Sequence, residues 1–345
     1  MKISIGMLAY NEEKVIANTI NQVLDQDIFI QLNFDVQFVV VANGCADKTV
    51  EIAQEVINHS KRNNLSVVNI EQAGKSNAWN SYIHDIAWQD ADYVLLIDAD
   101  IELIGTDGLS KLVQQLNATP KAVVSIDTPK KDVEKKNNKN PLEKFSLLLS
   151  KANKKNHNAI TGQLYCIRGA IVREIFLPFG LPVEDGFLSA MVHTENFTSN
   201  QVGEGKLTLE KSVAHYFHAL TKPSELIKHE KRLMIGSTIN SMVYDYLWKK
   251  VRGTKQHAGI LIRDLNKADP MWLVSLIEDY KDKRGFWFVP KKSFFKYLRL
   301  WRKSPITGYK QILKFSVAVC ITFVHAYLVI NVNFYFKTKN GVGYW

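Results

Sequence analysis

The chain has 345 residues, of which 46% are hydrophobic and 23% are charged, and it carries a net charge of +10 at pH 7. This composition is typical of a folded, largely soluble protein, and the length allows one large domain or a domain with an appended module. The three cysteines, Cys45, Cys166 and Cys320, lie far apart in the sequence. Their spacing excludes a disulfide framework or a cysteine-based metal site and favours a reducing compartment.

The positive charge is concentrated towards the C-terminus. Twelve Lys and Arg and no acidic residue follow Asp282, so the rest of the chain, with 32 basic and 34 acidic residues, is slightly negative. A nucleic-acid-binding protein usually carries its positive charge on a folded domain or in recognisable motifs, so we expect no nucleic-acid partner. The basic residues lie among Phe, Trp and Tyr and precede a long apolar run, which points to an anionic membrane surface instead.

Strand and helix patterns alternate along the first 126 residues. The expected strands are the apolar runs Lys2–Ala9, Phe38–Ala42, Ser66–Ile70, Tyr93–Asp100, which ends in two carboxylates, and Ala122–Ile126. The expected helices show apolar residues at helical spacing over Glu13–Leu24, Asp47–Val56 and Asn77–Trp88. This alternation predicts right-handed βαβ crossovers, and therefore an α/β fold with a mostly parallel sheet flanked by helices. Because the chain enters a strand at once, without a secretory signal, we expect it to start in the cytosol.

The later elements are less regular. The segment Lys130–Asn140 is rich in Lys and Asn and lacks apolar periodicity, which predicts a surface loop, with a lid or a ligand contact as the alternative. A further strand is expected over Ile160–Arg168 and a turn leading into a helix over Leu181–Val192. Helical patterns dominate from Pro223 onward.

Polar side chains follow each of the first four strands. They lie in the loops Tyr10–Glu13, Ala42–Thr49, Gly74–Asn80 and Asp98–Asp100. Because the carboxyl ends of parallel strands meet at one edge of a sheet, we expect these loops to converge there. Asp98 and Asp100 offer hard oxygen donors that suit Mg²⁺ or Mn²⁺, especially when a diphosphate completes the coordination shell. An isolated pair of this kind more often begins a solvated turn, so the other loops decide the interpretation.

The ordered set of four loops resembles the family 2 glycosyltransferases of the GT-A fold, over about residues 2–240. The resemblance implies a Rossmann-like sheet and an enzyme that moves a sugar from a nucleotide-diphosphate donor to a hydroxyl with Mn²⁺ or Mg²⁺ as cofactor. It assigns the donor to the matching residues Ala9, Tyr10, Glu12, Asn43, Lys75, Asp98 and Arg232. Asn43 stands where the family often has an Asp that reads the base. An amide still allows nucleobase contact but leaves the preference for uracil open.

The resemblance also implies a metal site. Asp98 would lie near the ribose and the metal, and Asp100 would bind the metal directly, so that charge on the leaving diphosphate is neutralised. Either His215 or His218 would supply a third ligand, and we choose His215; the alternative is that both histidines are structural.

The acceptor side is expected around Gly162, Gln163 and Glu184. Glu184 and Asp185 resemble the family's ED motif at the start of a helix. Asp185 would take the proton from the acceptor hydroxyl, and one base with direct attack implies inversion at the anomeric carbon. A helix N-terminus alone also favours acidic residues, which is the alternative explanation.

The segment His229–Gly236 stands where processive synthases of the family carry Q..RW followed by Gly. Arg232 and Gly236 match that pattern, whereas His229 and Leu233 depart from it. Loss of the Trp removes a sugar-stacking platform and argues against polymer synthesis. Arg232 would clamp the diphosphate as a bidentate donor or be a plain surface arginine.

The C-terminal segment predicts membrane contact. Basic and aromatic residues over Pro290–Lys310 suit an interfacial helix. The mostly apolar run Phe315–Phe336 is long enough to cross a bilayer but is interrupted by His325, Asn331 and Asn333. We therefore favour a helix that lies on or dips into one leaflet over a true span. The alternatives are a helix buried against the rest of the protein and a subunit interface.

The family resemblance, together with the composition of the C-terminal segment, implies an inverting, metal-dependent glycosyltransferase that adds a single sugar at the cytosolic membrane face, on a lipid-linked or cell-envelope glycan acceptor. Three regions are expected: a GT-A catalytic domain over residues 1–222, a helical region completing the site over 223–282, and a membrane-associating segment over 283–345. One alternative is a sugar-phosphate nucleotidylyltransferase, which would need a Gly-rich, Arg-containing loop after the first strand. Another is a non-catalytic, membrane-docked scaffold.

Overall fold

The structure is a computed structural model, and it describes residues 1–140, 142–144, 146, 147, 159–200, 203–254, 256–289, 294, 298 and 309–343. Its first half confirms the predicted alternation of strands and helices. The parallel strands are β1 (Lys2–Ala9), β2 (Asp35–Asn43), β3 (Leu65–Ile70) and β4 (Tyr93–Asp98). The helices between them are α1 (Ile16–Leu24), α2 (Thr49–His59) and α3 (Lys75–Ser81), with a short 3₁₀ turn over Asp27–Phe29 and a π-helical turn over Tyr82–Ile86.

The second half of the chain completes an eight-stranded sheet in the order β3-β2-β1-β4-β7-β6-β8-β5. The added strands are β5 (Glu102–Leu103), β6 (Val124–Lys131), β7 (Leu164–Arg168) and β8 (Leu207–Phe217). Four of the seven neighbouring strand pairs are parallel, and β7 enters antiparallel between β4 and β6. The predicted α/β class is therefore confirmed, and the sheet is mixed beyond β4.

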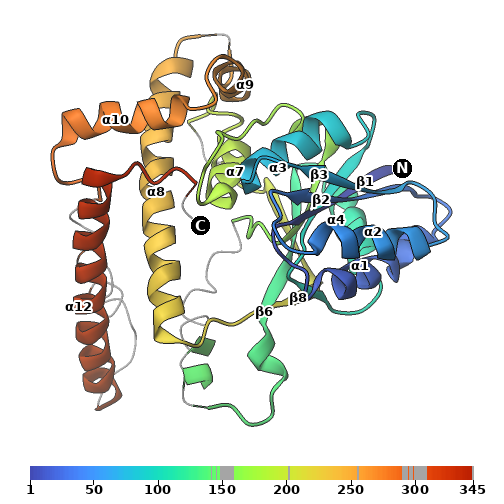
Figure 1. The fold of residues 1–345 in the computed structure, drawn as a ribbon, viewed down its shortest axis with the longest axis horizontal. Helices are drawn as coiled ribbons and strands as arrows, with labels where there is room; N and C mark the ends of the chain where they lie inside the picture. Colours follow the sequence, from blue (N-terminus) through green and yellow to red (C-terminus); the bar gives the residue numbers. More distant parts are fainter. Residues whose placement is uncertain are drawn as a thin grey trace.

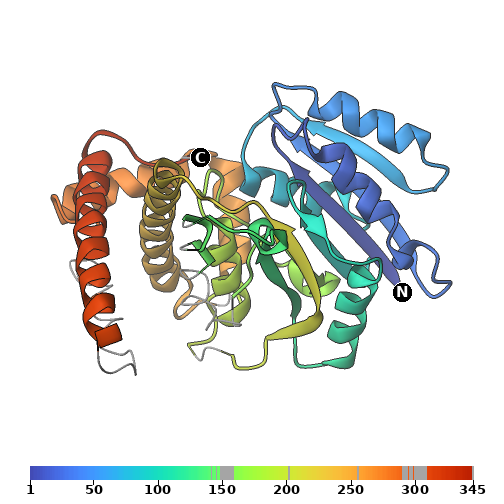
Figure 2. The same cartoon turned by 90° about the horizontal axis from the view of Figure 1, so that it is seen from below.

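Helices cover both faces of the sheet (Figures 1 and 2). The remaining helices are α4 (Gly108–Ala118), α6 (Gly169–Val172), α7 (Glu184–His193), α8 (Pro223–Val251), α9 (Ala258–Ala268), α10 (Trp272–Arg284) and α12 (Tyr309–Thr338). Alternate residues of β4 face two separate cores: Leu95 and Ile97 pack with α1, α2 and α4, whereas Val94 and Leu96 pack with α3, α7 and α8. Burial on both faces explains why this strand is a continuous apolar run.

The prediction of a surface loop over Lys130–Asn140 is wrong at its start. Strand β6 continues through Lys131, which pairs with Phe217 of β8, and a 3₁₀ turn follows over Asp132–Lys135. Pairing with β8 satisfies the backbone N–H and C=O groups of this segment. The polar side-chain pattern does not reveal that pairing. The lid alternative stays a prediction.

Helix α12 confirms that the apolar C-terminal run is helical. Among the described residues one helix, over Ala318–Thr338, is long and apolar enough to cross a membrane. One face of it packs in the larger core beside α8, and this face includes Val329, Val332 and Phe336. Both figures place α8 between α12 and the sheet (Figures 1 and 2). The interfacial helix expected over Pro290–Lys310 falls almost entirely outside the described residues.

A buried amide fixes α12 to the preceding segment. The Oδ1 atom of Asn333, which is fully buried, accepts hydrogen bonds from the backbone N–H groups of Phe288 at 2.7 Å and Val289 at 3.1 Å. Asn333 therefore interrupts the apolar run for a structural reason, since it satisfies two backbone donors that would otherwise be buried without partners.

Asn333→Leu tests this packing. The substitution leaves two buried N–H groups unsatisfied, so we expect the free energy of unfolding to fall by about 2–4 kcal/mol in denaturant titrations. Asn331→Leu, a partly exposed neighbour on the same helix, is the matched control and should change stability little. Equal stability of the two variants would contradict the packing of α12.

Candidate active site

A cleft of about 210 Å³ opens at the carboxyl edge of the parallel strands. Its walls include every residue that we assigned to the donor, namely Ala9, Tyr10, Glu12, Asn43, Lys75, Asp98 and Arg232, together with Asp100. The convergence expected from parallel strands thus places four loops around one hollow. Arg232 comes from α8, far along the chain, and lines the same cleft. Its role as a clamp on the diphosphate stays a prediction.

Asn43 ties three of these loops together. Its Nδ2 donates to the carbonyl oxygen of Ala9 at 2.9 Å, and its Oδ1 accepts from the backbone N–H of Gly74 at 3.0 Å. The side chain is only 3% exposed, so most of its hydrogen-bonding capacity serves the backbone. The sequence did not indicate this role, and base recognition by Asn43 stays a prediction that relies on its remaining N–H.

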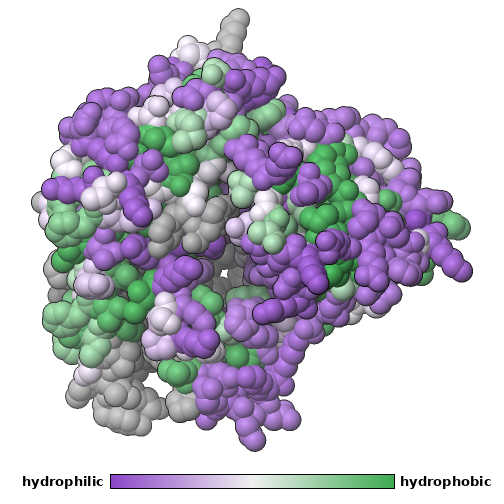
Figure 3. Space-filling model, in the orientation of Figure 1, coloured by the Kyte–Doolittle hydropathy of each residue, from purple (hydrophilic) through white to green (hydrophobic). Residues whose placement is uncertain are grey.

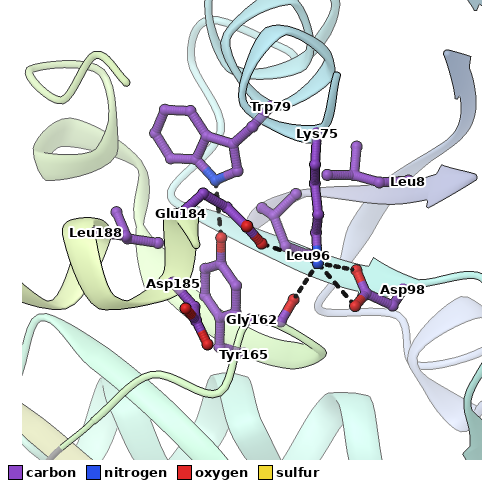
Figure 4. A pocket seen from close by; sticks show the side chains of 10 residues that line it. All are labelled: Leu8, Lys75, Trp79, Leu96, Asp98, Gly162, Tyr165, Glu184, Asp185 and Leu188. Carbon is purple, nitrogen blue, oxygen red and sulfur yellow. Dashed lines mark hydrogen bonds and ion pairs between the residues drawn. The ribbon is translucent and has the colours of Figure 1, made fainter. Parts of the chain in front are cut away.

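Lys75 lies at the centre of the site (Figure 4). Its Nζ is 2.7 Å from Oδ1 and 2.8 Å from Oδ2 of Asp98, and 3.0 Å from Oε1 of Glu184. It also lies 3.4 Å from the carbonyl oxygen of Gly162. Burial opposes the charged ammonium, but the two carboxylates outweigh this effect and raise the pKa of Lys75, which therefore stays charged. One cation thus joins the end of β4 to the start of α7.

The carboxylates around the cleft repel one another. Burial raises the pKa of Asp98 to about 7, although the charge of Lys75 lowers it, and the charge of Asp100 adds to the rise. Burial and the charges of Asp100, Asp47 and Asp98 raise the pKa of Glu12 to about 7. In the described part of the chain, the Asp100 carboxylate has no hydrogen-bond or ion-pair partner. The carboxylate oxygens of Asp100 and its neighbour Asp98 are ligands of the kind that a divalent cation such as Mg²⁺ or Mn²⁺ takes.

No trio of His, Cys, Asp or Glu side chains surrounds one point within the described ranges. His215 is fully buried on β8, where its Nδ1 lies 2.7 Å from Oδ2 of Asp127 and its Nε2 lies 3.2 Å from Oε1 of Gln163. A carboxylate on one ring nitrogen is the arrangement that commonly orients a metal-binding imidazole. His215 as third ligand therefore stays a prediction, and it requires Nε2 to leave Gln163.

His218 differs from His215 in its surroundings. It is an exposed residue whose Nδ1 lies 3.1 Å from Oδ2 of Asp132.

Asp127, the partner of His215, is a site-adjacent residue that sequence reasoning missed. Burial raises the pKa of Asp127. It lies inside a strand segment, and only the pairing of β6 with β8 brings it to the histidine.

Two of the three acceptor-side residues, Gly162 and Glu184, line a smaller cavity next to the donor cleft together with Asp185, whereas Gln163 does not line it. Asp185 is held at the first turn of α7, where its Oδ1 accepts from the N–H of Gly186 at 2.6 Å. Burial raises the pKa of Asp185 to about 6, and the charge of Glu184 adds to the rise. Gly162, at φ +75°, comes so close that an added Cβ would lie 2.9 Å from Cβ of Asp185. The loop before β7 therefore needs glycine here, both for its backbone and for space.

The two cavities are neighbours, because Leu8, Lys75 and Asp98 line both of them. Asp100 lines the larger cleft, and Asp185 lines the smaller cavity beside it. Gln163 borders the same junction, since its carbonyl oxygen accepts from the N–H of Asp98 at 2.8 Å. The arrangement brings the predicted donor residues, the predicted metal carboxylates and the predicted base together.

Two aromatic residues that the sequence analysis did not assign form the cavity wall. Nε1 of Trp79 donates to the hydroxyl of Tyr165 at 2.8 Å, and both side chains are buried beside Glu184 and Asp185 (Figure 4). Trp79 lies within the segment Gly74–Asn80, so an aromatic residue inside this polar motif could have indicated a place in the site. These rings give the cavity a rigid apolar base.

The ion pairs of Lys75 can be tested by unfolding measurements in the presence of a metal chelator. Lys75→Met removes the counter-charge of two carboxylates, so we expect a loss of about 3 kcal/mol in the free energy of unfolding at pH 8. The loss should be smaller at pH 5, because Asp98, with a pKa of about 7, is then protonated and needs no counter-charge. Thermal and denaturant unfolding of Lys48→Met, an exposed lysine, provides the control. A loss independent of pH would contradict the bridge.

Known proteins share this fold and sequence pattern. The family model described as glycosyl transferase family 2 matches residues 4–176, half of the chain. No curated protein sequence gives a significant match. A mannosyltransferase from Pyrobaculum calidifontis, in complex with GDP-Man and Mn²⁺, superposes with a TM-score of 0.51 at 13% identity, over 98% of this chain and 86% of that one. Glucosyl-3-phosphoglycerate synthase from Mycobacterium tuberculosis gives a TM-score of 0.44 at 17% identity, over 70% and 79% of the two chains.

The resemblance drawn from the loops is therefore confirmed, as is the GT-A type of fold. The match excludes the nucleotidylyltransferase alternative and makes the protein a glycosyltransferase. The chain belongs to glycosyl transferase family 2.

Proposed function

We propose that the enzyme moves a single sugar from a nucleotide-diphosphate donor to a hydroxyl acceptor, with inversion at the anomeric carbon and with Mn²⁺ or Mg²⁺ as cofactor. The observation that supports this most strongly is that the donor cleft and the Asp185 cavity lie side by side and share Lys75 and Asp98 in their walls. The similar mannosyltransferase from Pyrobaculum calidifontis was solved with GDP-Man and Mn²⁺. We propose a donor and an ion of the same classes here.

The donor side would bind the nucleotide in the larger cleft. Ala9, Tyr10, Glu12 and Asn43 line the part of this cleft in which we place the base and the ribose. Asp98 and Asp100 would hold the divalent ion, which when bound supplies positive charge next to the diphosphate. Lys75 and Arg232 are the cationic side chains of the cleft wall. They would neutralise the phosphates as the sugar–phosphate bond breaks.

The acceptor side would activate the incoming hydroxyl. Asp185 accepts the hydroxyl proton while the acceptor oxygen forms a bond to the anomeric carbon. The bond from that carbon to the diphosphate oxygen breaks, and the nucleoside diphosphate leaves with the bonding electron pair. Because attack and departure occur on opposite faces of the sugar, the configuration inverts. Gly162, Gln163 and Glu184 would contact or border the acceptor.

Single transfer is supported by the α8 segment that lines the cleft. Arg232 faces the site, but the next residue is Leu233 where a processive enzyme of the family would offer a Trp. Without a ring on which to stack a growing chain, the site favours one addition per acceptor. We propose residues 1–222 as the catalytic domain, 223–282 as the helical region that completes it and 283–345 as the membrane-associating segment.

We further propose that the enzyme works at the cytosolic face of a membrane, on a lipid-linked or cell-envelope glycan acceptor. The support is the outer face of α12, where exposed apolar residues recur at helical spacing: Phe323, Val324, Tyr327, Ile330 and Phe334. Figure 3 shows hydrophobic residues gathered over this side of the molecule. The opposite face packs against the protein, which favours a helix lying in one leaflet over a separate span.

Asp185→Asn tests the base. The substitution removes only the proton acceptor, so we expect the transfer rate to fall by about 10²–10⁴-fold while Mn²⁺-dependent donor binding, measured by calorimetry, stays within twofold. Asp25→Asn, an exposed acid outside the cleft, should retain full activity. Unchanged turnover in Asp185→Asn would refute this role.

Membrane docking is tested by flotation with vesicles. The full chain should float with vesicles containing anionic lipid, and the double variant Phe323→Ser/Phe334→Ser should lose most of this binding because it removes two rings from the lipid-facing surface. Leu32→Ser alters a more exposed apolar residue elsewhere and should bind normally. Absence of flotation by the unaltered protein would refute membrane docking and leave the transfer chemistry untouched.

A further inference from the structure

Helix α8 holds the start of the helix that carries the proposed base. Nδ2 of Asn240 donates to the carbonyl oxygen of Val183 at 2.9 Å, and the hydroxyl of Tyr244 donates to the carbonyl oxygen of Gly186 at 3.0 Å. These bonds fall on either side of Glu184 and Asp185. Gly236 of α8 packs directly on Val183, where an added Cβ would overlap the valine side chain. One side of this turn is therefore fixed by α8.

The C-terminal segment closes the other side of the same turn. After α12 the chain crosses α8 and ends beside α7 (Figure 1). The N–H of Gly343 donates to the carbonyl oxygen of Gly180 at 2.8 Å. Gly180 has φ +76°, and an added Cβ there would overlap Cγ1 of Val342. The loop that leads into Glu184 and Asp185 is thus shaped to receive this segment.

The crossing segment is itself anchored. Lys339 continues the helical bonding of α12, since its N–H donates to the carbonyl oxygen of Tyr335 at 2.8 Å. Gly341, at φ +78°, turns the chain against α8, where an added Cβ would lie 2.8 Å from Cγ2 of Ile235. Val342 packs against the larger core. The position of α12 therefore determines where residues 339–343 meet the loop.

We infer that residues 339–343 are a positioning element for Asp185. They clamp the loop of residues 180–183 against α8 and so hold the carboxylate where it faces the smaller cavity. This inference rests on the proposed role of Asp185 as base. A base must lie within hydrogen-bond reach of the proton that it takes, so a loosened loop lowers the rate of the chemical step. Most of the donor cleft is built from the ends of β1, β2 and β4, and it meets the clamped turn through the ion pair of Lys75 with Glu184. We therefore expect donor binding to change less than the rate of the chemical step.

Val342→Asp tests the clamp in the full chain, with Ile30→Asp, at an exposed apolar residue far from the site, as control. We expect faster hydrogen exchange in residues 180–186, unchanged exchange in β1–β3, and a kcat at least tenfold lower with the donor KM within twofold. Unchanged exchange in residues 180–186, or a full kcat, would overturn the inference. The hydrogen-exchange result tests the clamp even if the unaltered enzyme transfers no sugar. Absence of transfer by the unaltered enzyme would refute the proposed function and not the clamp.

A paired substitution guards against simple misfolding. Gly180→Ala should displace Val342 and impair kcat, and adding Val342→Ala removes the overlapping methyl group and should restore part of the loss. Alanine at position 180 strains the backbone equally in Gly180→Ala and in the double variant. The difference in kcat between these two variants therefore reports the contact with Val342 alone. If the double variant is as impaired as the sum of the two single variants, the clamp is refuted.

Discussion

The site depends on one ammonium group among several carboxylates. The Nζ of Lys75 contacts both oxygens of Asp98 and one oxygen of Glu184, and these three side chains come from three different elements. Without this cation, the end of β4 and the start of α7 would present like charges to each other in a partly buried space, at a cost that the surrounding packing would have to offset. The bridge therefore joins the two functional halves of the enzyme mechanically as well as electrostatically.

The mixed sheet explains why the site is built from two sides, one with the donor cleft and one with the loop of Gly162 and Gln163. The parallel strands β1–β4 deliver polar loops to one edge and build the donor cleft. The antiparallel strand β7 reverses direction next to β4, so that the loop before it, with Gly162 and Gln163, reaches the same edge from the other side. Helix α7 then begins beside that loop. Helices α8 and α12 cover the open flank. The inner face of α12 packs on α8, which holds the proposed base, and its outer face is the one that we propose for membrane contact.

The sequence predicted those parts of the site that depend on local pattern and strand order. Four polar loops after four parallel strands must meet, and for this reason Tyr10, Asn43, Lys75 and Asp98 could be assigned to one cleft before the structure was known. The carboxylates of Asp98 and Asp100 followed from the abrupt end of an apolar run. Arg232 could be assigned only through a family resemblance, because helical spacing on α8 gives no information about a cleft formed by distant strands.

Features that depend on long-range contacts could not be predicted. The bond of Asn43 to Gly74, the contact of His215 with Asp127 and the use of Asn333 to satisfy Phe288 and Val289 each join residues distant in the sequence. Polar residues of this kind look like binding groups or like interruptions of a pattern until their partners are known. The strand pairing of Lys131 was missed for the same reason, since a polar composition favoured a loop whereas the neighbouring strand β8 supplied the hydrogen bonds.

The most direct test of the account is a crystal structure of the enzyme with Mn²⁺ and a non-hydrolysable nucleotide-diphosphate sugar, with the metal located by its anomalous signal. The account predicts a manganese peak at Asp98 and Asp100, the diphosphate between that peak and Lys75, and a carboxylate oxygen of Asp185 on the far side of the anomeric carbon. A donor bound outside this cleft, or an anomeric carbon that Asp185 cannot reach from the smaller cavity, would contradict it.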